Sequence, residues 1–562
     1  MKSYVFPEGL SKICQEDILN IPDYKTIECI KIPDSVTDIL NSSFSGCVSL
    51  KRIILPKSLR KIFSRTFYSC ISLESIEIPN TVIEIGSEAF RGCHSLKSIQ
   101  ISSSVTEIKN HAFSGCHSLE SVHLPNGITE IGSEAFRGCH SLKSVHIPDT
   151  VTTIRTSAFE DCYALKSIEI PDSVTIIESK AFANCIFLDA IMIPKGVKTI
   201  ASYAFKGCTS LKRIDLPSSL RTIEEWAFME CMSLESINLP DGVTMMGECA
   251  FHGCNLKSII IPNSITELAE GLFDCCVVLE SVEIPESVKT IGEMAFQYCF
   301  SLKSIRLPDS VTEISASAFH KCTSLQSIKL PNFLETIRDN AFSFCKSLES
   351  INLPNSLKTI EYSAFEDCDL LTSVQIPDSV IEIGERAFAG CISLQSVKLP
   401  TSVTKINPQM FALCSSIRSM TIPEGVKLIG DEAFWGCSSL ESIKLPVSLV
   451  AIEREAFWCC RSLKSIVIPE LKGELTIGDC VFCGCLSLEY IKLPISVASI
   501  GNWAFNGCIS LKAICIPNGH QERFENMLNN PPDTPKRMVF PTNKQESWSW
   551  TGYSALDDYD DY

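Results

Sequence analysis

Hydrophobic positions recur along most of this chain with a period of 23 residues. Pro33, Pro56 and Pro79 mark the first steps, and the spacing continues with few exceptions to Pro517. Within one period the sequence reads P-x-S-V-T-x-I-G-x-x-A-F-x-G-C-x-S-L-x-S-I-x-I, almost unaltered in residues 377–399. A fixed period of this length is typical of a solenoid in which each repeat forms one turn. We therefore predict a repeat solenoid of about 21 turns over residues 33–517.

Two steps depart from the period. The step from Pro240 to Pro262 is one residue short, and the step from Pro469 to Pro494 carries two extra residues around 471–473. Loops tolerate such changes in length at little cost in free energy. We expect both to be absorbed as local adjustments of one turn.

Each position of the period has a predicted role. The segment L-x-S-I-x-I is predicted to be a parallel strand with alternate residues inward, and the following proline, which cannot donate to a sheet, ends it. The A-F-x-G-C segment turns the chain back. Phe and Cys recur in every turn, and residues one period apart stack about 4.8 Å apart when turns pair as parallel strands. The predicted fold is a β-rich, right-handed coil with its parallel sheet on the concave face and a core of ladders that includes Phe90, Cys93, Phe388 and Cys391.

The two ends of the repeat region depart from the pattern. Residues 1–32 match it only in part and are predicted to form a degenerate capping repeat, because an open terminal turn would expose core and strand edge. Residues 518–530 have the apolar spacing of a short capping helix. Residues 531–562 abandon the period and end in a run of Asp and Tyr. We expect this tail to be disordered.

The repeat frame I-P-x-S-V-T-x-I-G-x-x-A-F-x-G-C-x-S-L closely resembles the BspA-like subfamily of leucine-rich repeats over residues 33–517. That family includes bacterial surface antigens and adhesins, so the resemblance implies protein binding at a cell surface. It carries no shared catalytic residues.

Composition narrows the classes of partner. The net charge is −17, from 49 Lys and Arg against 66 Asp and Glu, which disfavours binding to a phosphate backbone. The first twenty residues lack a signal-like apolar stretch, and no later run has the length of a membrane span. We expect a monomeric cytoplasmic protein without nucleic acid or membrane insertion, with the cell surface as the alternative location. The 29 cysteines fit a reducing compartment, because no export signal accompanies them.

The cysteines are predicted to be structural. Stacked thiols at the strand spacing have Cβ atoms farther apart than disulfide geometry favours, so the ladder is interpreted as buried and reduced. Cys480 and Cys483 form a C-x-x-C, a weak metal signal without a second pair. The adjacent pairs at 275–276 and 459–460 are interpreted as structural in the same way.

Histidines cluster between residues 94 and 146. His94, His117 and His140 occupy one position of three successive turns, and His123 and His146 stack on a strand face. Imidazoles one turn apart could share a divalent metal or form a pH-sensitive patch. However, the string GSEAFRGCHSLKS occurs identically at 86–98 and 132–144, so duplication explains the repetition equally well. A metal-dependent enzyme built on this patch stays a disfavoured alternative, because no nucleophile, base and acid converge. We predict no enzyme activity, no metal site and no cofactor.

The outward position between the last two inward strand residues varies most from turn to turn. From Glu77 its charged members are acidic as far as Glu283, and from Arg306 onward they are basic, which would orient a partner of opposite polarity. Plain solvation of the strands is the alternative reading. We predict that this column binds a protein partner, through Glu77, Gln100, His123, His146, Glu169, Asp215, Glu283, Arg306, Lys329, Lys398, Lys444 and Lys492.

Overall fold

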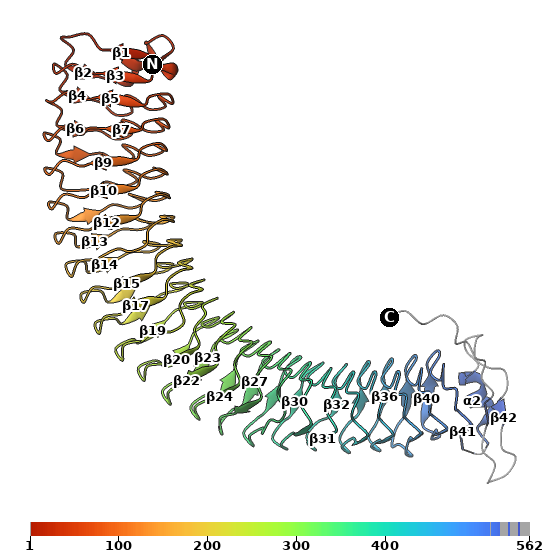
Figure 1. The fold of residues 1–562 in the computed structure, drawn as a ribbon. Helices are drawn as coiled ribbons and strands as arrows, with labels where there is room; N and C mark the ends of the chain where they lie inside the picture. The colour runs from red at the N-terminus through yellow and green to blue at the C-terminus, as the bar shows by residue number, and fades with distance from the viewer. Residues whose placement is uncertain (1, 518, 529–537, 540–548, 551–562) are drawn as a thin grey trace. The chain divides into compact units, whose positions relative to one another are not determined.

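The computed structural model describes residues 2–517, 519–528, 538–539 and 549–550. It divides into two units, Met1–Pro285 and Glu286–Tyr562. Within each unit the chain winds as a parallel β-solenoid, and the whole chain makes about 22 turns. Figure 1 follows the turns of each unit in chain order by colour. The predicted fold class is confirmed.

Every regular turn has three sides. The first side is a strand at the S-I-x positions, the second is a two-residue strand that ends at the Ile of T-x-I, and the third is the A-F-x-G-C turn. The sequence predicted the first-side strands, although Ser396–Lys398 is shorter than the six-residue segment expected there. It did not predict the second-side strands. They form because the T-x-I segment is extended and lies alongside the equivalent segment of the next turn, as with Glu130 and Thr153.

In the first unit, strands of each side pair in parallel with equivalent strands of adjacent turns and form several short sheets. The first-side strands are β1 (Ser3–Val5), β3 (Cys29–Lys31), β5 (Arg52–Ile54), β7 (Ser75–Ile76), β9 (Ser98–Gln100), β10 (Ser121–His123), β12 (Ser144–His146), β15 (Ala190–Met192), β17 (Arg213–Asp215), β20 (Ser258–Ile260) and β22 (Ser281–Glu283). The second-side strands are β2 (Lys12–Ile13), β4 (Asp38–Ile39), β6 (Lys61–Ile62), β8 (Glu84–Ile85), β11 (Glu130–Ile131), β13 (Thr153–Ile154), β14 (Ile176–Ile177), β16 (Thr199–Ile200), β18 (Thr222–Ile223), β19 (Met245–Met246) and β21 (Glu267–Leu268).

The second unit repeats this arrangement. Its first-side strands are β24 (Ser304–Arg306), β26 (Ser327–Lys329), β29 (Ser373–Gln375), β31 (Ser396–Lys398), β33 (Ser419–Thr421), β35 (Ser442–Lys444), β37 (Ser465–Val467), β39 (Tyr490–Lys492) and β41 (Ala513–Cys515). Its second-side strands are β23 (Thr290–Ile291), β25 (Glu313–Ile314), β27 (Thr336–Ile337), β28 (Thr359–Ile360), β30 (Glu382–Ile383), β32 (Lys405–Ile406), β34 (Leu428–Ile429), β36 (Ala451–Ile452), β38 (Leu475–Ile477) and β40 (Val497–Ile500). The long step is absorbed in a bend at residues 472–473, after which β38 pairs with β36 through Ile477 and Ile452. Strands β38 and β40 pair with a register shift between Leu475 and Thr476.

The core of each unit is built from ladders of identical side chains. Phe90 and Phe113 stack with ring centroids 5.4 Å apart and planes 4° apart, and Phe365 and Phe388 repeat this geometry at 5.4 Å and 6°. These rings are fully buried. The thiol of Cys93 donates to the carbonyl oxygen of Phe67 in the preceding turn, at 3.2 Å. Thiols at the equivalent position bond in this way along most of the chain, so the recurring cysteine both fills the core and satisfies a buried carbonyl.

The third side is held by a tight backbone geometry around each Phe. The residue two before Phe and the residue two after it both have positive φ, as with Glu88 at 59° and Gly92 at 75°. Most residues at the first of these positions are not glycine, although this conformation costs an L-residue roughly 1–2 kcal/mol. Bonds between turns offset that cost: the amides of Glu88, Phe90 and Gly92 donate to carbonyls of the following turn at 3.0, 2.8 and 2.8 Å.

The two ends differ from the regular turn. Helix α1 (Gln15–Leu19) replaces the third side of the first turn, with Ile18 buried and the amide of Cys14 donating to Asp17 at 2.7 Å. At the other end, Phe524 on helix α2 (Gln521–Leu528) is buried, and Arg523 beside it donates to carbonyls near β40. Strands β42 (Met538–Val539) and β43 (Ser549–Trp550) pair antiparallel. The rest of the tail predicted to be disordered, 531–562, lies outside the described residues.

Candidate functional site

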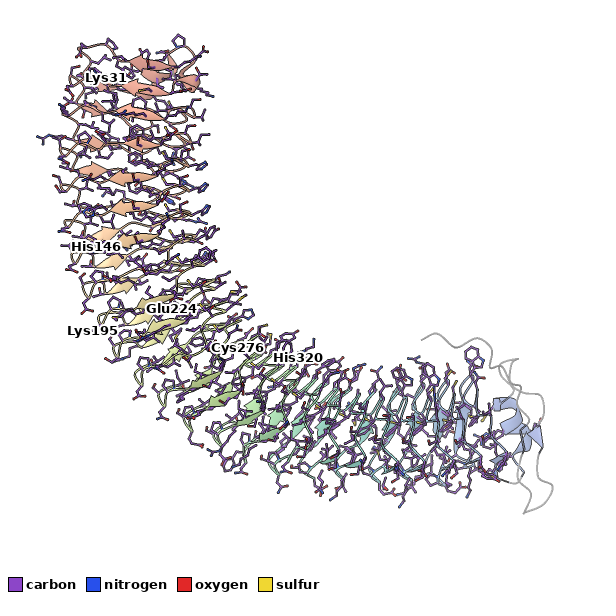
Figure 2. The ribbon with its side chains drawn as sticks, viewed as in Figure 1. Lys31, His146, Lys195, Glu224, Cys276 and His320 are labelled. Atoms are coloured by element: carbon purple, nitrogen blue, oxygen red, sulfur yellow. The ribbon has the colours of Figure 1, made fainter. Side chains whose placement is uncertain are left out.

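The variable residues that the sequence singled out lie in register on the first side. In the first unit, Gln100, His123 and His146 occupy neighbouring strand positions, and bridges extend the row to Glu77 at one end and Glu169 at the other. Lys31 and His146, which belong to this column, lie along the same edge in Figure 2. Because the side chains of alternate strand residues point to opposite faces, the whole column faces outward. We call this column the strand-face column.

In the second unit, the strand-face column is basic. Arg306 and Lys329 are neighbours on adjacent strands. Val467 lies between Lys444 and Lys492 in the same row of strands. Lys398 lies beside Gln375 in the same column. These cations are exposed.

The strand-face column differs from the neighbouring column in how its charged side chains are paired. Several residues directly after the recurring Leu form ion pairs between turns, as Lys464 does with Glu441 at 3.1 Å and Lys512 with Glu489 at 2.7 Å. Their charges therefore cancel locally. Within the described part of the chain, no ion pair engages the four strand-face lysines, Lys329, Lys398, Lys444 and Lys492, whereas Arg306 pairs with Glu286 at 2.8 Å.

The acidic members in the first unit show the same contrast. Among described residues, Glu77, Glu169 and Glu283 have no ion-pair partner, whereas Asp215 is held by Arg213 of its own strand at 2.9 Å. Unpaired exposed charge is what a partner of opposite sign can engage without first breaking an existing pair.

A shallow pocket interrupts the strand face of the first unit. It has a volume of ≈ 560 Å³ and lies where the turn at 236–239 has no assigned strand, between β17 and β20. Ile260 lines it with 66% of its surface exposed, beside Asn238 and Glu283. Met192 in the same column is 68% exposed. Sequence analysis did not predict this pocket, because no residue pattern marks the missing strand.

The histidine patch forms a parallel stack. His94, His117 and His140 lie with ring centroids 4.4 Å apart and planes 9° and 6° apart, and Tyr163 continues the stack. Nitrogen lone pairs lie in the ring plane, so in parallel rings they do not converge on a shared ion. Burial and the neighbouring imidazoles His94 and His140 lower the pKa of His117. The patch behaves as stacked, partly desolvated imidazoles beside a pocket of ≈ 400 Å³.

The ladder cysteines lie in a setting that suppresses thiolate chemistry. Burial raises the pKa of Cys116 to about 12, and Cys93 and Cys391 are shifted in the same direction. Because the thiolate is the reactive form, these thiols are poor nucleophiles at neutral pH. Cys480 and Cys483 lie on the third side, outside the ladder, where burial also raises both pKa values.

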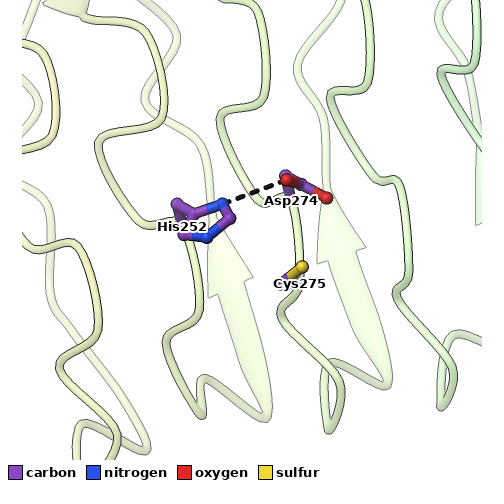
Figure 3. Close-up of side chains that lie close together, drawn as sticks. All are labelled: His252, Asp274 and Cys275. Atoms are coloured by element: carbon purple, nitrogen blue, oxygen red, sulfur yellow. Dashed lines mark ion pairs between the residues drawn. The ribbon is translucent and has the colours of Figure 1, made fainter.

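One cluster of chemically capable side chains was missed by sequence reasoning. His252, Asp274 and Cys275 come from the third sides of two adjacent turns, and one ligand atom of each lies within 4.8 Å of the others. Figure 3 shows the His252 imidazole facing the Asp274 carboxylate, with the Cys275 thiol beside them. His252 Nδ1 is 3.0 Å from Asp274 Oδ2. Cys275 was interpreted as structural with its neighbour, but only Cys276 belongs to the buried ladder.

The available signal for this cluster was the repeat register. His252 and Asp274 each directly follow a ladder Phe, so they share a column although they are not close in sequence. The short step from Pro240 to Pro262 removes one residue between them and hides the relation from a search at the regular period.

Together, the repeated turn, the stacked ladders and the exposed strand face define a leucine-rich-repeat scaffold. A family model described as a BspA type leucine rich repeat region of six copies matches the chain. The matched residues are 21–143, 129–256, 244–372, 364–476 and 475–546. The chain belongs to this family, which confirms the predicted resemblance.

Three solved structures illustrate what the chain is similar to. A leucine-rich repeat protein from Bacteroides ovatus is 36% identical, over 57% of this chain and 83% of its own, with a TM-score of 0.55. A leucine rich cell surface protein from Faecalibacterium prausnitzii is 28% identical, over 76% and 90%, with a TM-score of 0.27. The pneumococcal vaccine antigen PcpA is 24% identical, over 60% and 84%, with a TM-score of 0.39.

No curated protein matches the chain. Among the described residues, no helix combines the length and the apolar character that crossing a bilayer requires.

Proposed function

We propose that this chain is a non-catalytic protein-binding scaffold that engages its partner through the strand-face column. The observation that carries the proposal is a set of lysines in the second unit that are exposed and have no ion pair among the described residues: Lys329, Lys398, Lys444 and Lys492. The chemistry of this column calls for an acidic protein segment as the partner.

Three features support this choice of surface. The core residues recur in nearly every turn because they pack against one another. The strand-face column does not take part in this packing, so its residues can vary and determine which partner binds. Rigid strands hold its side chains in register, so little conformational entropy is lost on binding. The flanking Lys and Glu column is neutralised by its own pairs and contributes little to the net field.

The first unit offers a complementary surface. Its column is acidic through Glu77, Glu169 and Glu283, and the exposed Ile260 lines the neighbouring pocket. Apolar side chains in a pocket rimmed by polar groups are typical anchors of protein interfaces. A partner with a basic segment and an apolar anchor would fit this unit.

The test is affinity purification with the full chain and with the triple variant Lys398→Glu, Lys444→Glu and Lys492→Glu. A partner that binds the parent should lose at least tenfold in affinity for the variant, and its affinity for the parent should weaken with added salt. Circular dichroism of both proteins checks that the fold is kept.

The matched control is Lys358→Glu, Lys405→Glu and Lys427→Glu. These three lysines are also exposed, also in the second unit and also without an ion pair among described residues, but they lie on the second side. The control variant changes the net charge by the same amount as the strand-face triple variant, and it should still bind the partner. If both triple variants lose the partner equally, the effect is one of net charge, and the strand face is not the binding surface.

The same scaffold would serve as an adhesin if the chain is carried to a cell surface, and membership of the BspA-type family is the observation that favours this second setting. Protease shaving of intact cells separates the two. Loss of the full-length chain while cytoplasmic markers survive would place it outside, and its survival would place it inside.

A further inference from the structure

The His252, Asp274 and Cys275 cluster contains the donor set of a transition-metal site. One imidazole nitrogen, one carboxylate oxygen and one sulfur lie within 4.8 Å of one another. Ligands 2.0–2.3 Å from a tetrahedral zinc ion lie roughly 3.3–3.8 Å apart, so side-chain rotations suffice to close the set. We propose that these three residues bind a divalent transition-metal ion of the zinc type, bridging two adjacent turns of the first unit.

A buried carboxylate oxygen at the cluster indicates a ligand. Asp274 Oδ1 is buried and has no hydrogen-bond partner among the described residues, whereas the other oxygen, Oδ2, lies 3.0 Å from His252 Nδ1. Buried polar atoms in native proteins are nearly always satisfied, and an ion is one of the standard explanations for an exception. A metal ion beside Asp274 Oδ1 would satisfy that oxygen.

A second His–carboxylate pair in the same unit shows what is different here. His111 Nδ1 lies 3.2 Å from Glu134 Oε2, but Arg137 also binds that carboxylate, at 3.1 Å. Glu134 therefore already has a permanent cation. Asp274 has no Arg or Lys partner among described residues, and the thiol of Cys275 lies beside it instead.

The surroundings of the cluster are acidic. Glu248 and Glu270 lie in the same two turns, where the amide of Cys249 donates to the carbonyl oxygen of Glu270 at 2.9 Å. Carboxylates and thiols gathered at one site repel each other when ionised, and a divalent cation converts that repulsion into attraction. The local charge thus favours a cation.

The ligand atoms of the cluster determine which metal ions can bind. Sulfur and imidazole nitrogen are the ligands of zinc and its soft neighbours, whereas calcium and magnesium require oxygen ligands. Three protein ligands leave one tetrahedral position for water, so the bound ion should exchange with added metal.

The test uses cobalt(II) as a spectroscopic probe on the full chain in a non-thiol reductant. Sulfur-bound cobalt gives a charge-transfer band in the near ultraviolet, and tetrahedral coordination gives intense visible bands. We expect one equivalent to produce both and zinc to displace it. Cys275→Ser should abolish the charge-transfer band, and Asp274→Asn and His252→Gln should each weaken zinc binding tenfold or more.

Matched controls separate this site from the other thiols and imidazoles. Cys459 occupies the same position of its turn as Cys275, with φ of 58° against 60°, so Cys459→Ser should leave the band intact. His111→Gln removes the other paired imidazole and should also have no effect. Circular dichroism checks the fold of each variant.

The outcomes are distinct. A band lost in Cys275→Ser and kept in Cys459→Ser supports the site. A band that both variants keep, equal losses in both, or no band in the parent would overturn it. Partner capture does not depend on these residues, so the metal site and the proposed binding function can fail independently.

Discussion

The interior and the strand face of each turn use sequence in opposite ways. Phe388 and Cys391 stand in ladders whose members are nearly identical from turn to turn, whereas Lys398 in the same turn belongs to a column that changes sign and chemistry along the chain. The ladders need identity because each side chain stacks on its own copy. The strand face makes no such demand. The positions that repeat in this chain are therefore those that the fold requires, and the positions that vary are those that can determine which partner binds.

The largest effect should come from breaking the Phe ladder. Phe388 stacks between Phe365 and Phe411 at 5.4 and 5.9 Å and is fully buried. Phe388→Ala should lower the free energy of unfolding by about 3–5 kcal/mol, because it leaves a cavity between two turns. Urea denaturation followed by circular dichroism measures this. Lys398→Ala, on the surface of the same turn, should change the value by less than about 0.5 kcal/mol. Equal effects would contradict the division into core and face.

A smaller effect should come from the thiol ladder. Cys139 donates its thiol hydrogen to the Phe113 carbonyl at 3.3 Å and is fully buried. Cys139→Ala removes both the bond and part of the packing, and should cost about 1–2 kcal/mol in the same urea experiment. Cys459→Ala, which changes a partly exposed thiol outside the ladder, is the control and should cost less. A loss as large in the control would mean that the ladder position has no special role.

The smallest effect concerns pH. His117 has a pKa lowered from its ordinary 6.5 by burial and by the adjacent imidazoles His94 and His140. The unfolded chain therefore binds a proton at higher pH than the folded chain, so stability is complete above about pH 6.5 and falls as the pH drops toward the folded pKa. His117→Gln should reduce the loss of Tm between about pH 7.5 and 5.5. The slope should not vanish, because burial lowers the pKa of His320 as well. An unchanged slope would show that the stack does not couple to folding.

The period and the ladders could be predicted because the same residue type recurs at one spacing. Phe90 and Cys93 required only that equal positions stack, and the strand-face column followed from alternation along a strand. The positions of the first-side strands were correct for the same reason, although the strands are shorter than predicted.

The rest depended on geometry that carries no residue signal. Positive φ before each Phe is occupied by residues such as Glu88 and Trp226, which favour no left-handed conformation of their own. Hydrogen bonds between turns impose it. The metal cluster was missed because Asp274 and Cys275 become neighbours of His252 only when the shortened turn is placed in register. Tertiary register, not local propensity, decides both features.

The row of hydrogen-bonded thiols also provides natural probes of local unfolding along the solenoid. Each buried thiol is protected until its turn opens, and local opening in proteins has a free energy that differs from region to region. The rate at which a thiol reagent modifies Cys93, compared with Cys391, would therefore measure how often each turn breathes. A chain with one such probe in nearly every turn allows its stability to be mapped along its length, without introducing a single label.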